Sequence, residues 1–414
     1  MDTAVMSLSV RRFNVLWSSS ATPQRQPPLQ LAIPIVVAAW AVVFEAWRFV
    51  TMVQSQPANN DYRVFYLAAK TGITWGWPRM YDPATLAALN QSFGMSGSSS
   101  ISPVYTYLNP PLLAWLIGIL TPLPFTAGLY LWTALNIVAI AAACRLMFGR
   151  TSTWALALLG SLAVWPTAFA IERGQPELLL YALVVASWWC VQRGQQRWAG
   201  VLLGLAGCLK PQAVVLLPAV YLICGFPRTM LWWFATTAFA GAIFAAVLGP
   251  TGIGTYLGVS VWSASDPNFT AAQLISPFGT RFSLLFGQGL FAAIALLGVW
   301  MNRRSLRVAL AIGIIGTLTS GVHVHEYDYV GLIVAVWFAT DSSVSALDLA
   351  WIGAGIVCAQ LPAIGIRTAI LIWQPMWLGY LAVRAKLPLS SRVRWAEIRS
   401  LMPWRIASVN SPVA

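Results

Sequence analysis

Long, unbroken apolar stretches alternate with short polar ones along this chain, and that pattern predicts a bundle of membrane helices. A helix that spans a bilayer needs about 20 apolar residues, whereas a membrane β-barrel alternates apolar and polar positions. The apolar stretches run over 31–54, 111–121, 126–147, 153–170, 177–192, 198–209, 212–225, 229–249, 283–301, 306–321, 329–340, 346–360 and 367–383. Several are shorter than a full span, which is tolerated where protein buries the helix ends. We therefore predict an all-α, polytopic transmembrane helical bundle with about 10–13 membrane segments.

The composition supports this class and excludes others. The 414 residues are 58% hydrophobic and 9% charged, whereas soluble proteins have about 25% charged residues. The net charge of +13 would suit nucleic acid, but the basic residues form short clusters between apolar stretches, as they do on the cytoplasmic side of membrane proteins. We expect membrane lipids and no nucleic acid as partners. The five cysteines lack C-x-x-C spacing and indicate small buried side chains.

The basic clusters also predict the orientation of the chain. They occur at Arg11/Arg12/Arg25, Arg145/Arg150, Arg193/Arg197, Arg303/Arg304/Arg307 and Arg384/Lys386/Arg392/Arg394. Placing all of them in the cytoplasm makes 1–30 a basic cytosolic segment, 31–384 the membrane domain and 385–414 a basic cytosolic tail. If both 111–121 and 126–147 crossed the membrane, Arg145 would lie outside the cytoplasm. We therefore predict that 111–121 is a short helix that does not fully cross.

Polar segments then gather at the extracytoplasmic face. They are the long loop 55–109, the turn near 171–176, the stretch 251–282 and the connection 321–328. Together they contain most of the acidic side chains between helices, both histidines and an aromatic-rich loop. We therefore expect any chemistry on this face of the membrane.

Asp61, in the stretch NNDYRVFYLAAK, is open to two interpretations. It could cap a helix that begins at Tyr62, although the two Asn residues before it could do so in its place. Alternatively, it is a general base that takes a proton from a sugar hydroxyl attacking an activated donor. Tyr62, Phe65 and Tyr66 could stack on a sugar ring or seat the loop on the helices.

The segment HVHEYD at 323–328 is unusually polar for this chain. Zinc chemistry needs three or four ligands, and the chain has only two histidines, so we expect no metal site. We predict that His325 donates to a phosphate or hydroxyl and that Glu326 or Asp328 orients it.

Two further interruptions of apolar sequence are candidates for substrate binding. The turn IERGQPE contains Glu172, Arg173, Gln175 and Glu177. It indicates either a turn with an internal ion pair or a functional site within the membrane. Lys210 lies in GCLKPQ, where Pro211 breaks the helix, and is either a snorkelling lysine or a phosphate ligand.

Three weaker candidates complete the expected binding site. Arg281 could assist Lys210 as a bidentate phosphate clamp. Tyr107 and Asn109, in YTYLNPP, are expected at the membrane interface. No GxxxxGK[ST] phosphate loop and no Gly-rich dinucleotide fingerprint occurs in the sequence, so we expect no nucleotide cofactor.

Six short motifs occur in order along roughly residues 31–340: DYRVFYLAA, MYDP, YLNPPLLAWL, GQPELLLYAL, GLAGCLKPQ and HEYDYVGL. In that order they resemble glycosyltransferase family 87. Its members include polyprenyl-phosphate-mannose-dependent α-mannosyltransferases, and related membrane enzymes transfer arabinofuranose. Departures from the family pattern at Pro176, at Glu177 and before His325 leave the acceptor and the sugar open.

The resemblance implies a GT-C membrane fold in the bacterial cell membrane, with catalysis on the extracytoplasmic face. It implies a polyprenyl-phosphate sugar donor, a glycolipid or glycan acceptor and no cofactor. On this pattern Asp61 is the catalytic base and His325 lies near the donor phosphate. The expected chemistry is a direct displacement that gives an α-linkage, with Lys210, Arg281 and His325 stabilising the departing polyprenyl phosphate.

Other classes remain open on the sequence alone. A transporter or flippase for a polar lipid would share the broken helices and buried charges, although the hydropathy shows no inverted repeat. An arabinofuranosyltransferase, an O-antigen-ligase-like enzyme, an acyltransferase or a structural membrane subunit are the further alternatives.

Overall fold

The computed structural model describes most of the membrane domain. The described residues are 29–56, 60–92, 107–149, 153–263, 270–271, 274, 280–321, 323–340, 343–384 and 392–394. The predicted cytosolic segment 1–30 and the tail 385–414 therefore lie almost wholly outside them.

The described chain is almost entirely helical, which confirms the predicted all-α bundle. The α-helices are α1 (Leu29–Ser55), α2 (Tyr62–Trp75), α3 (Pro83–Ser92), α4 (Pro111–Gly118), α5 (Phe125–Phe148), α6 (Thr153–Leu162), α7 (Trp165–Arg173), α8 (Glu177–Gln192), α9 (Gln196–Leu209), α10 (Leu217–Ile223), α11 (Pro227–Ser263), α12 (Thr280–Met301), α13 (Leu306–Thr319), α14 (Val330–Ala339), α15 (Ala346–Gln360) and α16 (Thr368–Val383). Short 3₁₀ helices are η1 (Trp77–Arg79), η2 (Pro211–Ala213), η4 (Glu326–Tyr329) and η5 (Leu361–Ile364). The two short strands, β1 (Ser343–Ser345) and β2 (Arg392–Arg394), pair antiparallel.

Several helices have the length and composition to cross a membrane. Within the described residues, 4 helices qualify on their own, and the bent pair α6 and α7 makes up to 5. The shorter apolar helices, which include α8, α13 and α16, have 10–17 residues and pack within the bundle. The chain is thus a polytopic membrane protein, and the expected number of 10–13 segments stays a prediction.

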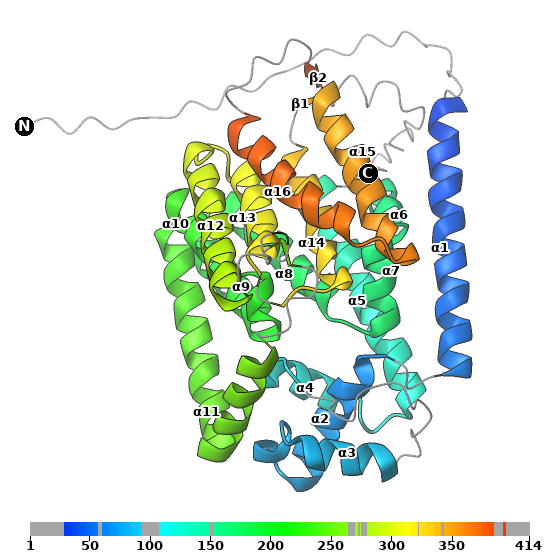
Figure 1. Cartoon of the computed structure of the whole chain (residues 1–414), viewed down its shortest axis with the longest axis vertical. Coiled ribbons are helices and arrows are strands. Elements are labelled where there is room, and N and C mark those ends of the chain that lie inside the picture. The colour runs from blue at the N-terminus through cyan, green and yellow to red at the C-terminus, as the bar shows by residue number, and fades with distance from the viewer. Residues whose placement is uncertain are drawn as a thin grey trace, which may run out of the picture.

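The long loop after α1 differs from its predicted form. Much of it folds as α2 and α3, which gather with α4 at one end of the molecule, while β1 and β2 lie at the opposite end (Figure 1). Helix α4 has only 8 residues, so it rises about 12 Å and cannot cross a bilayer. This confirms the prediction that 111–121 contains a short helix that does not cross.

Helix α9 packs closely on α11 because two of its residues are glycines four positions apart. A Cβ at Gly200 would lie 2.4 Å from the Thr229 carbonyl oxygen, and one at Gly204 would lie 2.7 Å from the Thr236 Cβ. Small residues at this spacing let membrane helices approach each other. The contact holds the C-terminal end of α9, where the chain breaks at Pro211, in a fixed place.

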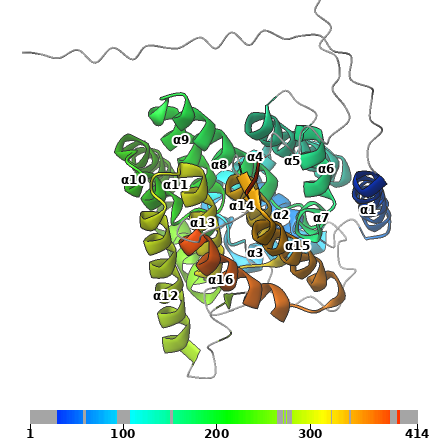
Figure 2. The same cartoon turned by 90° about the horizontal axis from the view of Figure 1, so that it is seen from above.

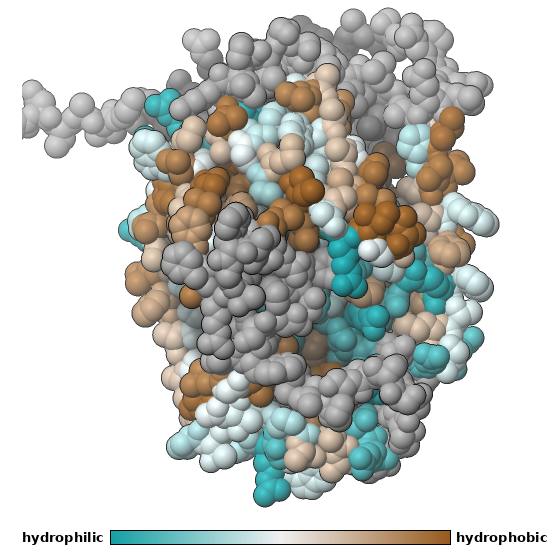
Figure 3. All heavy atoms as spheres, viewed as in Figure 1, coloured by the Kyte–Doolittle hydropathy of each residue, from teal (hydrophilic) through white to brown (hydrophobic). Residues whose placement is uncertain are grey.

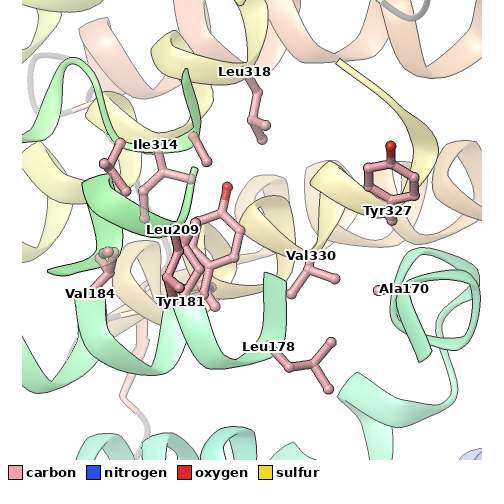
Figure 4. Close-up of a cluster of buried hydrophobic side chains, with 14 of the residues drawn as sticks. Ala170, Leu178, Tyr181, Val184, Leu209, Ile314, Leu318, Tyr327 and Val330 are labelled. Carbon is pink, nitrogen blue, oxygen red and sulfur yellow. The ribbon is translucent and has the colours of Figure 1, made fainter. Parts of the chain in front are cut away.

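The core lies where α8, α9, α13 and α14 meet. Tyr181 of α8 is fully buried at its centre, with Leu209 and Ile314 close by (Figure 4). The same view places Tyr327 beside Ala170 of α7, at the edge of this core. The core therefore supports both the end of α9 and the segment that contains Tyr327.

Helix α1 stands at the periphery of the bundle (Figure 2). Its main neighbours are α6 and α7, and large apolar side chains such as Trp40 and Val36 are exposed on it. In a membrane protein such a surface faces lipid. Its C-terminal end leads into the residues that precede α2.

Candidate active site

Asp61 is held between two segments that are far apart in the sequence. It precedes α2 immediately, but its side chain does not cap that helix. Asn60 provides the cap, because its Oδ1 accepts a hydrogen bond from the Arg63 backbone N–H at 3.2 Å. The Asp61 Oδ2 instead accepts a hydrogen bond from Gln175 Nε2 at 2.6 Å. The carboxylate is therefore directed toward the α7–α8 turn and is not used as a helix cap.

Asp61 is half-buried, and its neighbours act on its pKa in opposite directions. Burial raises the pKa above its ordinary value and is the largest effect, because a carboxylate loses hydration there. The charge of Arg173 and the hydrogen bond from Gln175 lower the pKa without cancelling the effect of burial. A carboxylate with a raised pKa accepts protons more readily, which suits a general base.

The turn between α7 and α8 is built around Gly174. This residue has a left-handed backbone with φ of 69°, a conformation that costs a residue with a Cβ about 1–2 kcal/mol. A Cβ there would also lie 2.6 Å from the Tyr62 Cβ. The Gly174 carbonyl accepts a hydrogen bond from Trp132 Nε1 at 2.8 Å. These contacts fix the turn against α2, so that Gln175 reaches Asp61.

Three charged side chains meet in the interior behind this turn. The Lys210 Nζ lies 2.6 Å from Glu177 Oε1 and 2.5 Å from Asp328 Oδ1. The exposed fractions of these side chains are 4% for Lys210, 0% for Glu177 and 3% for Asp328. This lysine does not snorkel to the membrane surface. It forms a buried ion cluster that joins α8, the end of α9 and η4.

The HVHEYD segment is shaped by Asp328. The Asp328 Oδ2 accepts the His325 backbone N–H at 2.7 Å, in a capping box at the start of η4. The His325 Nε2 lies 2.7 Å from the His323 Nε2. Burial, reinforced by the neighbouring His323, lowers the pKa of His325 to about 3. His325 is therefore a neutral imidazole at physiological pH and can donate one hydrogen bond.

A column of aromatic rings connects α7 to His325. Trp165 stacks on Phe169 with ring centroids 5.2 Å apart, and Phe169 stacks on Tyr327 at 6.0 Å. Tyr327 in turn lies 5.1 Å from the His325 ring. The Arg173 guanidinium lies over Phe169, 4.9 Å from the ring centroid. Among the described residues, no carboxylate forms a close ion pair with Arg173, and its charge acts on both Asp61 and His325 from a distance.

The acidic residues at the edge of this column bind to distant partners. Glu172 pairs with Arg48 of α1 and not with Arg173, so the described residues do not show the internal ion pair that was one of the two interpretations of the turn. The Glu326 Oε2 accepts a hydrogen bond from Trp165 Nε1 at 2.8 Å. Both carboxylates therefore hold elements together around the site.

Two apolar cavities border these elements. One of about 480 Å³ lies between α4, the α9–η2 break and α11, and its walls include Pro111, Pro211 and Trp233. The other, of about 380 Å³, lies along α14 between α6 and α15, from Tyr329 to Thr340. Figure 3 shows hydrophilic side chains around a hollow in one face of the molecule, with strongly hydrophobic side chains above it. Apolar and polar surfaces thus adjoin in this region.

The described part of the chain contains no group of three or more His, Cys, Asp or Glu that could hold a metal ion. A half-buried carboxylate, with an arginine whose charge acts on both this carboxylate and a neutral histidine, is suited to taking a proton next to an anionic group.

Comparison with known proteins identifies the family. The family model for glycosyltransferase family 87 matches residues 107–340, which is more than half of the chain. The chain belongs to glycosyltransferase family 87. Comparisons with curated proteins and with solved structures gave no match. Asp61 lies before the matched region, whereas the α7–α8 turn, Lys210 and His325 lie within it.

Four predicted substrate-binding residues of this glycosyltransferase pack in the core. Tyr62 and Tyr107 are fully buried, and Tyr66 packs against Phe125 with ring centroids 5.3 Å apart. The Tyr107 hydroxyl donates to the Pro110 carbonyl at 2.7 Å. Asn109 is also buried. In this structure these side chains pack around α2 and α4, and their role in substrate binding stays a prediction.

Other predicted site residues divide between contact with Asp61 and structural support. Gln175 contacts Asp61, while Glu177, Asp328 and Lys210 bind one another. Arg281 lies in α12, but its side chain lies outside the described residues. The sequence indicated Arg173 only as one of several charged residues in the turn, and did not distinguish it from its neighbours as the cation without a carboxylate ion-pair partner among the described residues. Arg48 could have indicated this, because an arginine within an apolar helix needs an acidic partner, and here that partner is Glu172.

Proposed function

We propose that this membrane glycosyltransferase transfers a sugar, with mannose as the first candidate, from a polyprenyl-phosphate donor to a hydroxyl of a glycolipid or glycan acceptor. The observation that carries the proposal is the 2.6 Å hydrogen bond from Gln175 Nε2 to Asp61 Oδ2. It leaves the other Asp61 oxygen available to a substrate hydroxyl, near Arg173, whose charge also acts on His325. The proposed reaction requires no cofactor.

In the proposed reaction Asp61 takes the proton of the acceptor hydroxyl. The hydroxyl oxygen then attacks the anomeric carbon from the face opposite the phosphate. The bond between that carbon and the phosphate oxygen breaks, and polyprenyl phosphate leaves with the bonding electrons. This displacement inverts the anomeric carbon, so a β-linked lipid donor gives an α-linked product.

Arg173 and His325 are the proposed partners of the departing phosphate. Arg173 has no carboxylate partner among the described residues, and an arginine suits bidentate contact with phosphate. His325 is neutral and can donate a hydrogen bond as negative charge develops. Lys210 is left out of this role because two carboxylates already enclose it.

The surroundings support a lipid donor on the extracytoplasmic side of a bacterial cell membrane. The two apolar cavities offer room for an isoprenoid chain next to the polar residues. The orientation rests on the positive-inside pattern of the sequence, which places the α2–α4 end outside the cytoplasm. The choice of mannose rests on the family likeness alone.

The decisive experiment uses the purified full chain in lipid nanodiscs, with polyprenyl-phosphate-mannose and an extract of cell-envelope glycolipids as acceptors. We expect release of polyprenyl phosphate and formation of a glycosylated product. Asp61→Asn should lower the turnover by about 10²–10⁴-fold, the contribution of a general base. The matched control is Asp82→Asn, because Asp82 belongs to the same loop and accepts the Ala84 N–H at 3.2 Å as a helix cap.

Each outcome has a defined consequence. Loss of turnover in Asp61→Asn, with normal yield and normal turnover in Asp82→Asn, supports the proposal. Near wild-type turnover in Asp61→Asn overturns Asp61 as the base. If the protein is active with polyprenyl-phosphate-arabinofuranose and not with the mannose donor, arabinofuranose replaces mannose as the proposed sugar. Release of a lipid pyrophosphate from a lipid-linked oligosaccharide would indicate a ligase.

A further inference from the structure

Lys210 is a deeply buried cation, and three partners surround its ammonium group. An ammonium group has three N–H donors. Two of its acceptors are Glu177 and Asp328, and the third direction faces the Tyr327 ring, whose centroid lies 4.6 Å from Nζ. No donor remains for a phosphate. We propose that Lys210 is a positioning residue. It fixes the relative positions of His325 and Asp61 and does not itself contact the substrate.

One path leads from Lys210 to His325. Asp328 uses one carboxylate oxygen for Lys210 and the other for the His325 backbone N–H, at 2.5 and 2.7 Å. Lys210 thereby fixes the plane of the Asp328 carboxylate. That plane decides where the chain turns at His325, just before η4.

A second path leads from Lys210 to Asp61. Lys210 binds Glu177, the first residue of α8. Gln175, two residues earlier, donates to Asp61. Because Pro176 lies between them, the backbone from Gln175 to Glu177 has little freedom. A shift of Glu177 would therefore move the Gln175 amide that orients the Asp61 carboxylate.

The position of Lys210 at a helix break explains why one residue serves both paths. Helix α9 ends at Leu209, Lys210 has an extended backbone with φ of −156° and ψ of 91°, and Pro211 opens η2. This break turns the lysine side chain inward. The close packing of α9 on α11 holds the break in place, so the ammonium is a fixed point between the two loops.

The buried charges dictate how the proposal is tested. Removing Lys210 alone would leave two unpaired buried carboxylates, which is strongly destabilising, whereas removing a whole buried ion cluster is often tolerated. The main variant is therefore the neutral triple Lys210→Met/Glu177→Gln/Asp328→Asn. A second, milder variant is Asp328→Asn alone. The matched control is Lys70→Met, because Lys70 lies in α2 and forms no ion pair within the described residues.

The kinetic readout separates positioning from binding. A displacement of about 1 Å in a catalytic group costs about 10²-fold in rate. We expect the triple variant to lower kcat by about that factor and to change the donor KM by less than about threefold. Arg173→Met, which removes a proposed phosphate partner, should instead raise the donor KM at least tenfold. Lys70→Met should leave both parameters unchanged.

A second readout does not depend on the reaction. In hydrogen–deuterium exchange of the full chain in nanodiscs, peptides that cover 323–329 should exchange faster in Asp328→Asn and in the triple variant than in the wild type. Peptides from α3 should not change. This arm keeps its meaning if the triple variant folds poorly, because Asp328→Asn is nearly isosteric.

The inference rests on the proposed function for its kinetic arm only. It is overturned by a donor KM that rises at least tenfold in the triple variant with kcat retained, which would make Lys210 a phosphate ligand. It is also overturned by unchanged exchange at 323–329, or by wild-type kcat in a folded triple variant. If Asp61→Asn stays active while exchange at 323–329 rises, the proposed base fails and the positioning by Lys210 stands.

Discussion

At the scale of single residues, the reactivity of Asp61 depends on the balance between burial and two polar neighbours. Burial favours the protonated form, while the charge of Arg173 and the Gln175 hydrogen bond favour the ionised form. A carboxylate must be ionised to act as a base, so turnover depends on the fraction of Asp61 that is ionised. The pKa of His325, lowered to about 3, adds no second titration between about pH 5 and 8.

The pH dependence of turnover tests this balance. Turnover should rise with pH as Asp61 loses its proton, with a midpoint above about 3.9, the ordinary pKa of Asp. Gln175→Met removes a donor that favours the ionised form, so the pKa of Asp61 rises further and the acidic limb moves to higher pH. The measurement is kcat against pH for both proteins. The control is Gln192→Met, an exposed residue at the end of α8. A limb that moves to lower pH, or equally in both variants, would contradict the assignment.

At the scale of elements, the α7–α8 turn depends on Gly174. Gly174→Ala combines the cost of a left-handed backbone, about 1–2 kcal/mol, with overlap of the new Cβ and the Tyr62 Cβ at 2.6 Å. We expect a lower melting temperature and, because Gln175 moves, a loss of turnover of about 10²-fold. Both are measured on the purified full chain.

Gly365 supplies the matched control for that change. It is also in the left-handed region, with φ of 84° and ψ of 0°, but a Cβ there meets no atom within 4 Å. Gly365→Ala should therefore lower the melting temperature only by the backbone cost and leave turnover unchanged. Equal effects at the two glycines would show that the turn does not position the site.

Elements with clear boundaries in the sequence were well predicted. The stretches 177–192 and 346–360 coincide with α8 and α15, because polar or Pro-containing turns flank continuous apolar residues. A helix does begin at Tyr62, as the capping interpretation of Asp61 supposed. By contrast, the sequence predicts a loop where α3 forms, since this stretch is neither strongly apolar nor strongly periodic.

The partners of charged and aromatic side chains could not be predicted in the same way. Arg48 and Glu172 are 124 residues apart, so local spacing carries no information about their pairing. Tyr62 and Tyr107 were expected near a sugar, but an aromatic ring in an apolar chain suits a core equally well. The motifs and the topology predicted only that Asp61 and Gln175 lie on the same face of the membrane. Their hydrogen bond is seen only in the folded structure.

At the scale of the whole molecule, polar function is concentrated toward one end of an apolar bundle. Helices α2, α3 and α4 gather at one end, and the strands that join the two C-terminal segments lie at the other (Figure 1). Asp61 leads directly into α2, and the peripheral α1 is tied to α7 by the Arg48–Glu172 pair. The fold thus brings the site to the end that the basic residues predict to be extracytoplasmic.

That orientation is open to a direct labelling test. Ala88 of α3 and Gln195 of the α8–α9 turn are both exposed, and the positive-inside pattern assigns them to opposite sides of the membrane. In intact cells, a membrane-impermeant maleimide should label Ala88→Cys, whereas Gln195→Cys should react only after permeabilisation. The wild type serves as background, because its five free cysteines are buried or half-buried. Labelling of Gln195→Cys alone in intact cells would place Asp61 in the cytoplasm. The donor would then have to present its sugar on that side, and an extracytoplasmic reaction would be excluded.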